Sequence, residues 1–89
     1  MSAGYRVFVR RPAEETLARL PPKIRRQVAE RLLELVSNPR PQGVKLLRGR
    51  EKTFRVDSGE YRIVYEIDDA ERRVTVRVVK HRKDVYRNL

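Results

Sequence analysis

The sequence predicts an α+β domain in which a helical hairpin packs on one face of an antiparallel-rich sheet. A short segment rich in β-forming residues, Tyr5–Arg10, precedes two segments whose apolar residues recur with the period of a helix. Three segments with alternating apolar residues then follow one another closely between positions 53 and 80, as strands joined by hairpins do. A chain of 89 residues has room for one core, so we expect one domain over residues 1–89 whose first four residues form an unstructured lead-in.

The first strand and the first helix are predicted within residues 5–20. Tyr5–Arg10 alternates and is rich in β-forming residues, which favours a strand. Pro12 suits the first turn of a helix, and Glu14 and Glu15 lie where the helix dipole favours negative charge. We expect this short helix to bury three apolar residues on its inner face: Ala13, Leu17 and Leu20.

A second helix is expected after Pro21 and Pro22, which end the first helix and can begin another. Its apolar residues recur along one stripe at helical spacing: Ile24, Val28, Leu32, Leu35 and Val36. The segment Ser37–Gly43 contains two prolines and a glycine, so it cannot continue a helix. We therefore expect the two helices to form a hairpin that lies on a sheet.

Three strands are expected after a basic connection, Val44–Lys52. They are Thr53–Asp57, Tyr61–Asp68 and Arg73–Lys80. Apolar residues recur at every second position of these strands and mark the face that packs under the helices. These residues are Phe54, Val56, Tyr61, Ile63, Tyr65, Ile67, Val74, Val76 and Val78.

Net charge is the strongest compositional signal. Lys and Arg number 22 against 12 Asp and Glu, which gives a formal charge of +10. Such a field raises encounter rates with polyanions, and the rigid fork of arginine suits phosphates and stacked bases. We therefore expect a nucleic-acid partner ahead of an acidic protein or a membrane surface, with a merely basic soluble surface as the alternative.

Several function classes are disfavoured by composition. The absence of cysteine excludes disulfides, thiol catalysis and thiolate metal sites. No apolar run approaches the roughly 18 residues of a membrane span, and a signal-peptide pattern is missing, so the cytoplasm is the expected location. The acidic cluster Asp68, Asp69 and Glu71 is better explained as turn chemistry than as a metal site, and we expect neither a metal nor another cofactor.

Arginines are expected on the sheet face that points away from the helices. If Ser58-Gly59 is a two-residue hairpin loop, Arg55 lies directly opposite Arg62, and parity places Arg77 and His81 on the same face. Like charges opposite each other are destabilising, a cost that a phosphate-binding site accepts. The alternative is that nearby acids neutralise these arginines in surface ion pairs of little energetic value: Asp57, Glu60 and Glu66.

Four residues are candidates for chemistry on RNA. His81 is the only histidine, and an imidazole is a natural proton carrier near neutral pH, although a lone histidine is more often structural. Tyr86 could exchange a proton or stack on a base, or could plug the sheet. Guanidinium groups stay protonated, so Arg62 and Arg82 would neutralise the charge that develops when a 2′-hydroxyl attacks its own phosphate.

The chain resembles the RelE/ParE superfamily of toxins from type II toxin-antitoxin modules, over nearly everything from Tyr5 to Arg87. The resemblance is closer to the RelE branch than to ParE. It is carried by the order and spacing of five pieces: Leu20-Pro21, Asn38-Pro39, Lys45–Gly49, Tyr61–Ile67, and His81-Arg82 followed by Val85-Tyr86.

This resemblance implies a β-α-α-β-β-β fold with a short C-terminal helical turn. It also implies a ribosome-dependent endoribonuclease that cuts mRNA in the ribosomal A site without a metal. A RelB-like antitoxin is the implied partner, and operator DNA is bound only through the toxin-antitoxin complex. The active-site pattern of the family carries over to Arg55, Arg62, Arg82 and Tyr86, and we expect RNA contacts from five residues: Arg55, Lys52, Lys45, Arg48 and Arg77.

One departure from the family pattern leaves the general base open. RelE toxins carry a second basic residue two positions after the residue that matches Arg55, and here that position is Asp57. Lys52, His81 or a residue of the basic connection could substitute. Two other functions stay open as well: a ParE-like toxin that inhibits DNA gyrase by binding, and a non-catalytic basic module that binds RNA or the ribosome.

Overall fold

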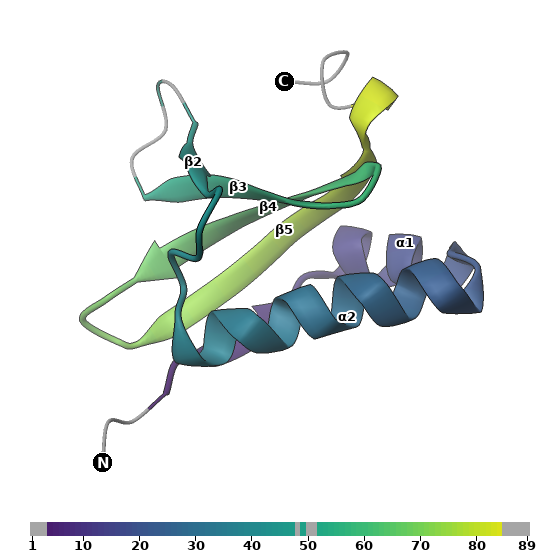
Figure 1. The fold of residues 1–89 in the computed structure, drawn as a ribbon. Coiled ribbons are helices and arrows are strands. Elements are labelled where there is room, and N and C mark those ends of the chain that lie inside the picture. The colour runs from purple at the N-terminus through teal and green to yellow at the C-terminus, as the bar shows by residue number, and fades with distance from the viewer. Residues whose placement is uncertain (1–3, 48, 50–51, 85–89) are drawn as a thin grey trace.

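The computed structural model describes residues 4–47, 49 and 52–84, and it has the predicted α+β architecture. Two helices lie on one face of a five-stranded sheet (Figure 1), and residues 82–84 form the expected helical turn. The helices are α1 (Arg11–Arg19) and α2 (Pro22–Ser37). The strands are β1 (Arg6–Val9), β2 (Lys45–Leu46), β3 (Thr53–Ser58), β4 (Tyr61–Asp68) and β5 (Arg73–His81).

The sheet has the order β1-β5-β4-β3-β2. β1 runs parallel to β5, and the other neighbours are antiparallel. Because β1 and β2 are the two edge strands, the helical hairpin carries the chain from one edge to the other beneath a single face. The opposite face carries no helix of the hairpin (Figure 1), and we call it the open face.

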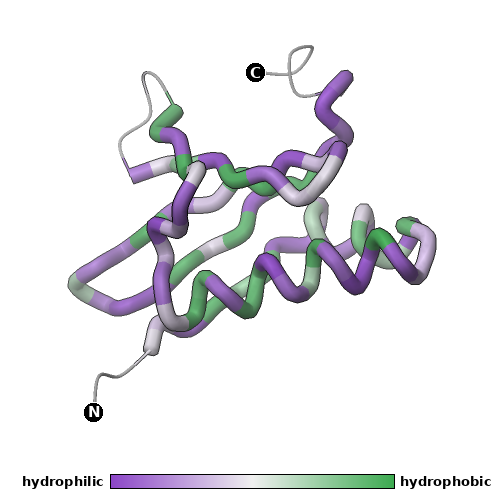
Figure 2. Tube along the Cα trace, in the orientation of Figure 1, coloured by the Kyte–Doolittle hydropathy of each residue, from purple (hydrophilic) through white to green (hydrophobic). Residues whose placement is uncertain are grey.

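The core forms where the apolar stripe of the helices meets the sheet. In Figure 2, hydrophobic positions of α2 recur along the side that faces the strands. Val36 was predicted to join this stripe, but it is 36% exposed because it sits at the end of the helix, where its carbonyl oxygen accepts a hydrogen bond from the backbone of Tyr5. The buried cluster comprises Ala13, Leu20, Val28, Leu32, Leu35, Val56, Ile63, Tyr65, Ile67, Val74, Val76 and Val79.

The basic connection contains a strand that was not predicted. Lys45 and Leu46 pair with Arg55 and Phe54 of β3. Two residues are too few to show alternation, so no sequence pattern marks this strand. It rises from the sheet on the side away from the helices (Figure 1) and places Lys45 on the open face beside Arg55.

The β3–β4 hairpin is displaced from the predicted register. Its turn is Gly59-Glu60, and Ser58 pairs with Tyr61. Gly59 has φ +59°, a conformation that glycine adopts without steric cost, so the turn begins there. As a result Arg55 faces Val64, and Asp57 faces Arg62. The prediction that Arg55 lies opposite Arg62 was wrong.

A β-bulge in β5 reverses the facing of its last residues. Val64 pairs with Val78 and Tyr65 with Val76, so Arg77 is the extra residue of the bulge. A single inserted residue exchanges inward and outward positions along the rest of the strand. Val79 is therefore buried in the core where Val78 was predicted to be.

A polar network fastens the β4–β5 turn to two other parts of the chain. The hydroxyl of Tyr5 donates a 2.6 Å hydrogen bond to Asp69 Oδ1, and both terminal nitrogens of Arg40 donate to the same carboxylate at 3.1 and 2.8 Å. The Arg40 guanidinium also lies 5.3 Å from the ring centroid of Phe54. Hydrogen bonds from Arg40 and then from Tyr5 lower the pKa of Asp69 to about 2.

This network predicts a stability change in acid. The carboxyl of Asp69 has a lower pKa in the folded chain, about 2, than its ordinary value of 3.8, so its stabilising effect is present above about pH 4 and is lost as the pH falls toward 2. Asp69→Asn should therefore be less stable than the wild type near neutral pH, and the difference should shrink across this interval. Urea denaturation at several pH values measures it. Glu71→Gln is the matched control, because it removes a carboxylate of the same turn that has no ion pair among the described residues.

A second prediction concerns the buried hydroxyl of Tyr65. This hydroxyl donates a 2.7 Å hydrogen bond to the carbonyl of Pro39, and burial raises its pKa to about 12. Tyr65→Phe leaves that carbonyl without its partner, so the free energy of unfolding should fall by about 1 to 2 kcal/mol. Tyr61→Phe is the control, because the Tyr61 hydroxyl makes no hydrogen bond within the described part of the chain. Equal losses in the two variants would contradict the assigned role of the bond.

Candidate functional site

Basic side chains dominate the open face of the sheet. The register places seven basic residues there against three acidic ones, counting only the described strands. β2 and the turn at residues 82–84 rise on this side at opposite ends of the sheet (Figure 1), so the face is bordered at both ends. The basic residues are Arg6, Lys45, Arg55, Arg62, Arg73, Arg77 and Lys80, and the acidic ones are Asp57, Glu66 and Asp68.

One carboxylate holds two of the predicted arginines. Asp57 Oδ1 lies 3.1 Å from Arg62 Nε and 3.8 Å from Arg55 Nε. Both arginine side chains are only 14% exposed, whereas Asp57 is 47% exposed. The buried Nε of Arg62 has no partner with hydrogen-bond geometry among the described residues, so its contact with Asp57 is an ion pair alone. Two guanidinium groups are thus held in place while their hydrogen-bonding capacity is only partly used.

Lys80 completes this group, and the sequence had not pointed to it. Lys80 of β5 lies directly opposite Arg62 of β4. In a strand without the bulge, a different residue would occupy this position. Cα atoms opposite each other in an antiparallel pair are about 5 Å apart, so two positive side chains emerge side by side. Only knowledge of the bulge would have placed Lys80 on the open face.

Glu60 organises a second group beside the β3–β4 turn. Its carboxylate oxygen Oε2 lies 2.9 Å from Arg82 Nε and 3.9 Å from His81 Nε2. The backbone N–H of Arg82 also donates a 2.7 Å hydrogen bond to the Glu60 carbonyl. The N–H of Lys83 donates to His81 Nδ1 at 3.2 Å, so the neutral imidazole carries its proton on Nε2, the nitrogen nearer Glu60.

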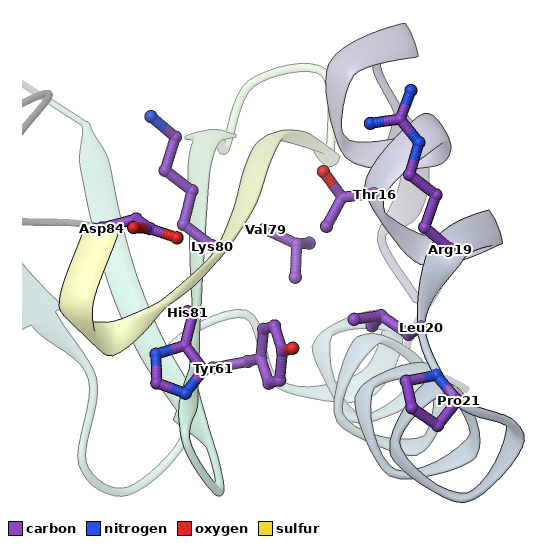
Figure 3. Close-up of a pocket in the computed structure, with 9 residues that line it drawn as sticks. All are labelled: Thr16, Arg19, Leu20, Pro21, Tyr61, Val79, Lys80, His81 and Asp84. Carbon is purple, nitrogen blue, oxygen red and sulfur yellow. The ribbon is translucent and has the colours of Figure 1, made fainter.

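His81 does not share the face of Arg62, and that prediction was wrong. The bulge turns it toward the helices, where it pairs with Tyr61 and meets that ring edge-on at a centroid distance of 5.3 Å. Figure 3 shows His81 and Tyr61 side by side, across from Thr16, Arg19 and Leu20. These residues line a hollow of about 410 Å³ at the end of the sheet. His81 reaches the arginine group only through Glu60.

The other predicted residues are spread more widely. Arg77 lies on the open face as expected, with its guanidinium 2.7 Å from Glu66 Oε2. Lys52 is exposed, and its carbonyl accepts a hydrogen bond from the backbone of Ile67, at the opposite end of β3 from Asp57. The alternative prediction, that nearby acids form ion pairs with the arginines, is confirmed. Asp57, Glu60 and Glu66 each contact an arginine. Two predicted residues lie outside the described part of the chain: Arg48 and Tyr86.

Two further findings concern metal binding and membrane spanning by the described residues. Among residues 4–47, 49 and 52–84, no group of three or more His, Asp or Glu side chains converges as a metal site would require. No helix within the described ranges combines the length and the apolar composition needed to cross a membrane.

Comparison with known proteins decides the family. Residues 7–86 match the family model described as the ParE toxin of the type II toxin-antitoxin system, parDE. The toxin RelG of Mycobacterium tuberculosis is 37% identical over 93% of this chain and 97% of its own length. The chain belongs to the RelE/ParE superfamily of type II toxins.

Solved structures place this toxin in the RelE branch. The crystal structure of the toxin-antitoxin complex RelBE2 from M. tuberculosis superposes with a TM-score of 0.78 at 36% identity, covering 94% of this toxin and 98% of that chain. The archaeal RelE-RelB complex from Pyrococcus horikoshii gives a TM-score of 0.80 at 25% identity, covering 89% and 96%. The α+β fold is therefore that of RelE toxins.

The arginine group of the toxin can exchange one anion for another. A phosphodiester and a carboxylate both offer paired oxygens, which guanidinium groups bind through two parallel hydrogen bonds. Asp57 is about half exposed, so it can swing toward solvent when a phosphate arrives, whereas Arg62 and Arg55 are held by their surroundings. The site thus carries an internal carboxylate at a position suited to an external anion such as a phosphate.

This exchange predicts opposite effects of Asp57→Asn on stability and on binding. Loss of the charge that compensates buried Arg62 should lower the free energy of unfolding by about 1 to 3 kcal/mol. Loss of the competing carboxylate should at the same time tighten binding of a short single-stranded RNA. Denaturation and fluorescence anisotropy measure the two effects.

Glu30→Gln is the control for net charge, since Glu30 is exposed on α2, away from the open face, and forms no ion pair among the described residues. It should change RNA affinity less than Asp57→Asn does. A similar gain from both variants would show that Asp57 acts only through the overall charge.

Proposed function

We propose that this toxin is a ribosome-dependent endoribonuclease that cleaves mRNA in the ribosomal A site by attack of a 2′-hydroxyl on the adjacent phosphate, without a metal. The observation that carries the proposal is the pair of arginines, Arg62 and Arg55, that share one exchangeable carboxylate on the open face, with Lys80 opposite Arg62 on the next strand. In this reaction the 2′-oxygen bonds to phosphorus and the bond to the 5′-oxygen breaks. The products are a 2′,3′-cyclic phosphate and a free 5′-hydroxyl.

The arginines supply electrostatic stabilisation in this proposal. Negative charge on the non-bridging oxygens grows as the 2′-oxygen attacks, and fixed cations in a partly desolvated site stabilise it without reorganisation. Arg62 is suited to this because it is largely buried and anchored beside Asp57. Arg82 would approach the phosphate from the turn at residues 82–84 once it leaves Glu60.

Proton transfer needs a group that accepts the proton of the 2′-hydroxyl and one that protonates the 5′-oxygen. We assign His81 to the second of these roles, because its Nε2 carries the proton of the neutral ring and faces Glu60, which also contacts Arg82. Tyr86 remains a second proton carrier on sequence grounds. Lys52 is a poor general base, since it lies five residue positions from Asp57 along an extended strand, about 16 Å. A role in RNA binding fits it better.

A cognate antitoxin is the proposed protein partner. The M. tuberculosis and P. horikoshii relatives were solved as complexes of a toxin with its antitoxin, the second of them named RelE-RelB. We propose that a RelB-like antitoxin neutralises this toxin in the cytoplasm, and that operator DNA is bound only through the complex. The formal charge of +10 favours an antitoxin segment rich in acidic residues.

Inhibition of DNA gyrase is the second candidate function, because the matching family model is named for ParE. That activity would depend on protein contacts and would not require Arg62. Mapping mRNA ends after a brief pulse of expression separates the candidates. New ends within translated codons indicate cleavage on the ribosome, whereas unchanged transcripts together with gyrase-linked DNA breaks indicate the second activity.

The decisive substitution is Arg62→Ala. Removing one charge-stabilising group should lower the cleavage rate on programmed ribosomes by about 100-fold or more and should abolish growth arrest on expression. Arg26→Ala is the matched control: Arg26 is exposed on α2 and forms no ion pair among the described residues, so the variant loses the same charge away from the site. Circular dichroism checks that both variants fold. A folded Arg62→Ala protein that still cleaves mRNA would refute the assignment.

A further inference from the structure

A large aromatic side chain lies exposed on the open face, away from the arginine group around Asp57. Phe8 occupies the middle of edge strand β1 and is 48% exposed. Its strand neighbours Val7 and Val9 pack against the core, so alternation directs Phe8 to the opposite side. The register pairs Phe8 with Thr75 of β5, which in turn pairs with Glu66, a residue of the open face.

Arginines surround this ring. Arg6 precedes Phe8 by two positions, and its guanidinium carbon lies 5.8 Å from the ring centroid. Arg10 follows by two positions, and its backbone continues the ladder through a hydrogen bond to Val76. Arg73 and Arg77 flank Thr75 in the same way on the next strand, each paired with an acid. Within the described ranges, neither Arg6 nor Arg10 forms an ion pair.

We propose that Phe8 and Arg6 form an accessory nucleotide-binding subsite, in which an unpaired RNA base stacks on the Phe8 ring. Exposed aromatics on a sheet face stack bases in many RNA-binding domains, and neighbouring arginines bind the phosphates or cover the other face of the base. The charge of the surroundings favours an anionic ligand over a cationic partner or an apolar helix, and the exposed aromatic ring favours one that carries a stacking base. The inference rests on the proposed action on RNA.

The position of the subsite fits one RNA strand that also reaches Arg62. Phe8 of β1 lies level with Thr75 of β5. Arg62 of β4, which is two strands from β1, lies level with Lys80 of β5. Strand spacing and rise per residue place the two sites about 15 to 20 Å apart on the same face. Arg77 lies between them along β5. The subsite would therefore hold a nucleotide several positions from the cleaved bond, or an unpaired base of ribosomal RNA beside the A site.

The test compares Phe8→Ala, Phe8→Leu and Phe8→Trp with the wild type. The probes are a short single-stranded RNA whose 2′-hydroxyls are methylated to prevent cleavage, and ribosomes without mRNA. Loss of one stacked base should weaken binding by about 5- to 100-fold in the Ala and Leu variants, and Trp should restore it. Leu33→Ala is the control, because Leu33 is an equally apolar exposed residue on α2. Weakened binding to the oligonucleotide assigns the base to mRNA, and an effect confined to ribosomes assigns it to ribosomal RNA.

Three results would overturn the inference. The first is wild-type affinity of Phe8→Ala for both RNA probes. The second is wild-type RNA affinity of Phe8→Leu, which would mean that any apolar side chain suffices. The third is a loss confined to antitoxin binding, which would make the patch a protein-docking surface. Failure of the proposed cleavage is read separately, from transcript ends, so oligonucleotide binding that depends on Phe8 can persist even if the toxin cuts no mRNA.

Discussion

The arrangement of the site depends on one irregularity, the bulge at Arg77 in β5. Every residue after it faces the opposite way from an unbroken strand, so Lys80 joins Arg62 and His81 turns toward the helices. The same irregularity buries Val79 and thereby fits the end of β5 against Tyr61 and Leu20. Core packing and surface chemistry at this end of the sheet are therefore set together.

Crowding of positive charge on one face requires local compensation. Asp57 provides it near the end of β3 and Glu60 within the β3–β4 turn, each by contacting two basic side chains. The exposed pair of Glu60 with Arg82 adds little net stability, unlike the pair of Asp57 with the largely buried Arg62. Both acids hold guanidinium groups in place, so that binding an external anion requires displacement of a side chain and little rearrangement of the backbone.

The elements could be predicted from the sequence because their apolar periods are long and consistent, as in Ile24 to Leu35 of α2 and Tyr61 to Ile67 of β4. Details that depend on a single residue could not. Gly59 suits either position of a two-residue turn, and Val78 and Val79 are equally apolar, so neither the hairpin register nor the bulge leaves a local signal. The arginines were found because their residue type defines their chemistry. The position of Lys80 on the open face and that of His81 on the helix side could be known only from the strand register of the structure.

The parallel pairing of β1 with β5 has a consequence for synthesis. β1 can pair with β5 only when Arg73–Val76 has left the ribosomal tunnel, long after β1 itself has emerged. Contacts between such distant segments form late and slow the completion of a fold. Because β5 also contributes Lys80, the nascent polypeptide cannot assemble its cationic surface during most of its own translation. Chain topology thus separates the time at which the toxin is synthesised from the time at which its cationic surface is complete.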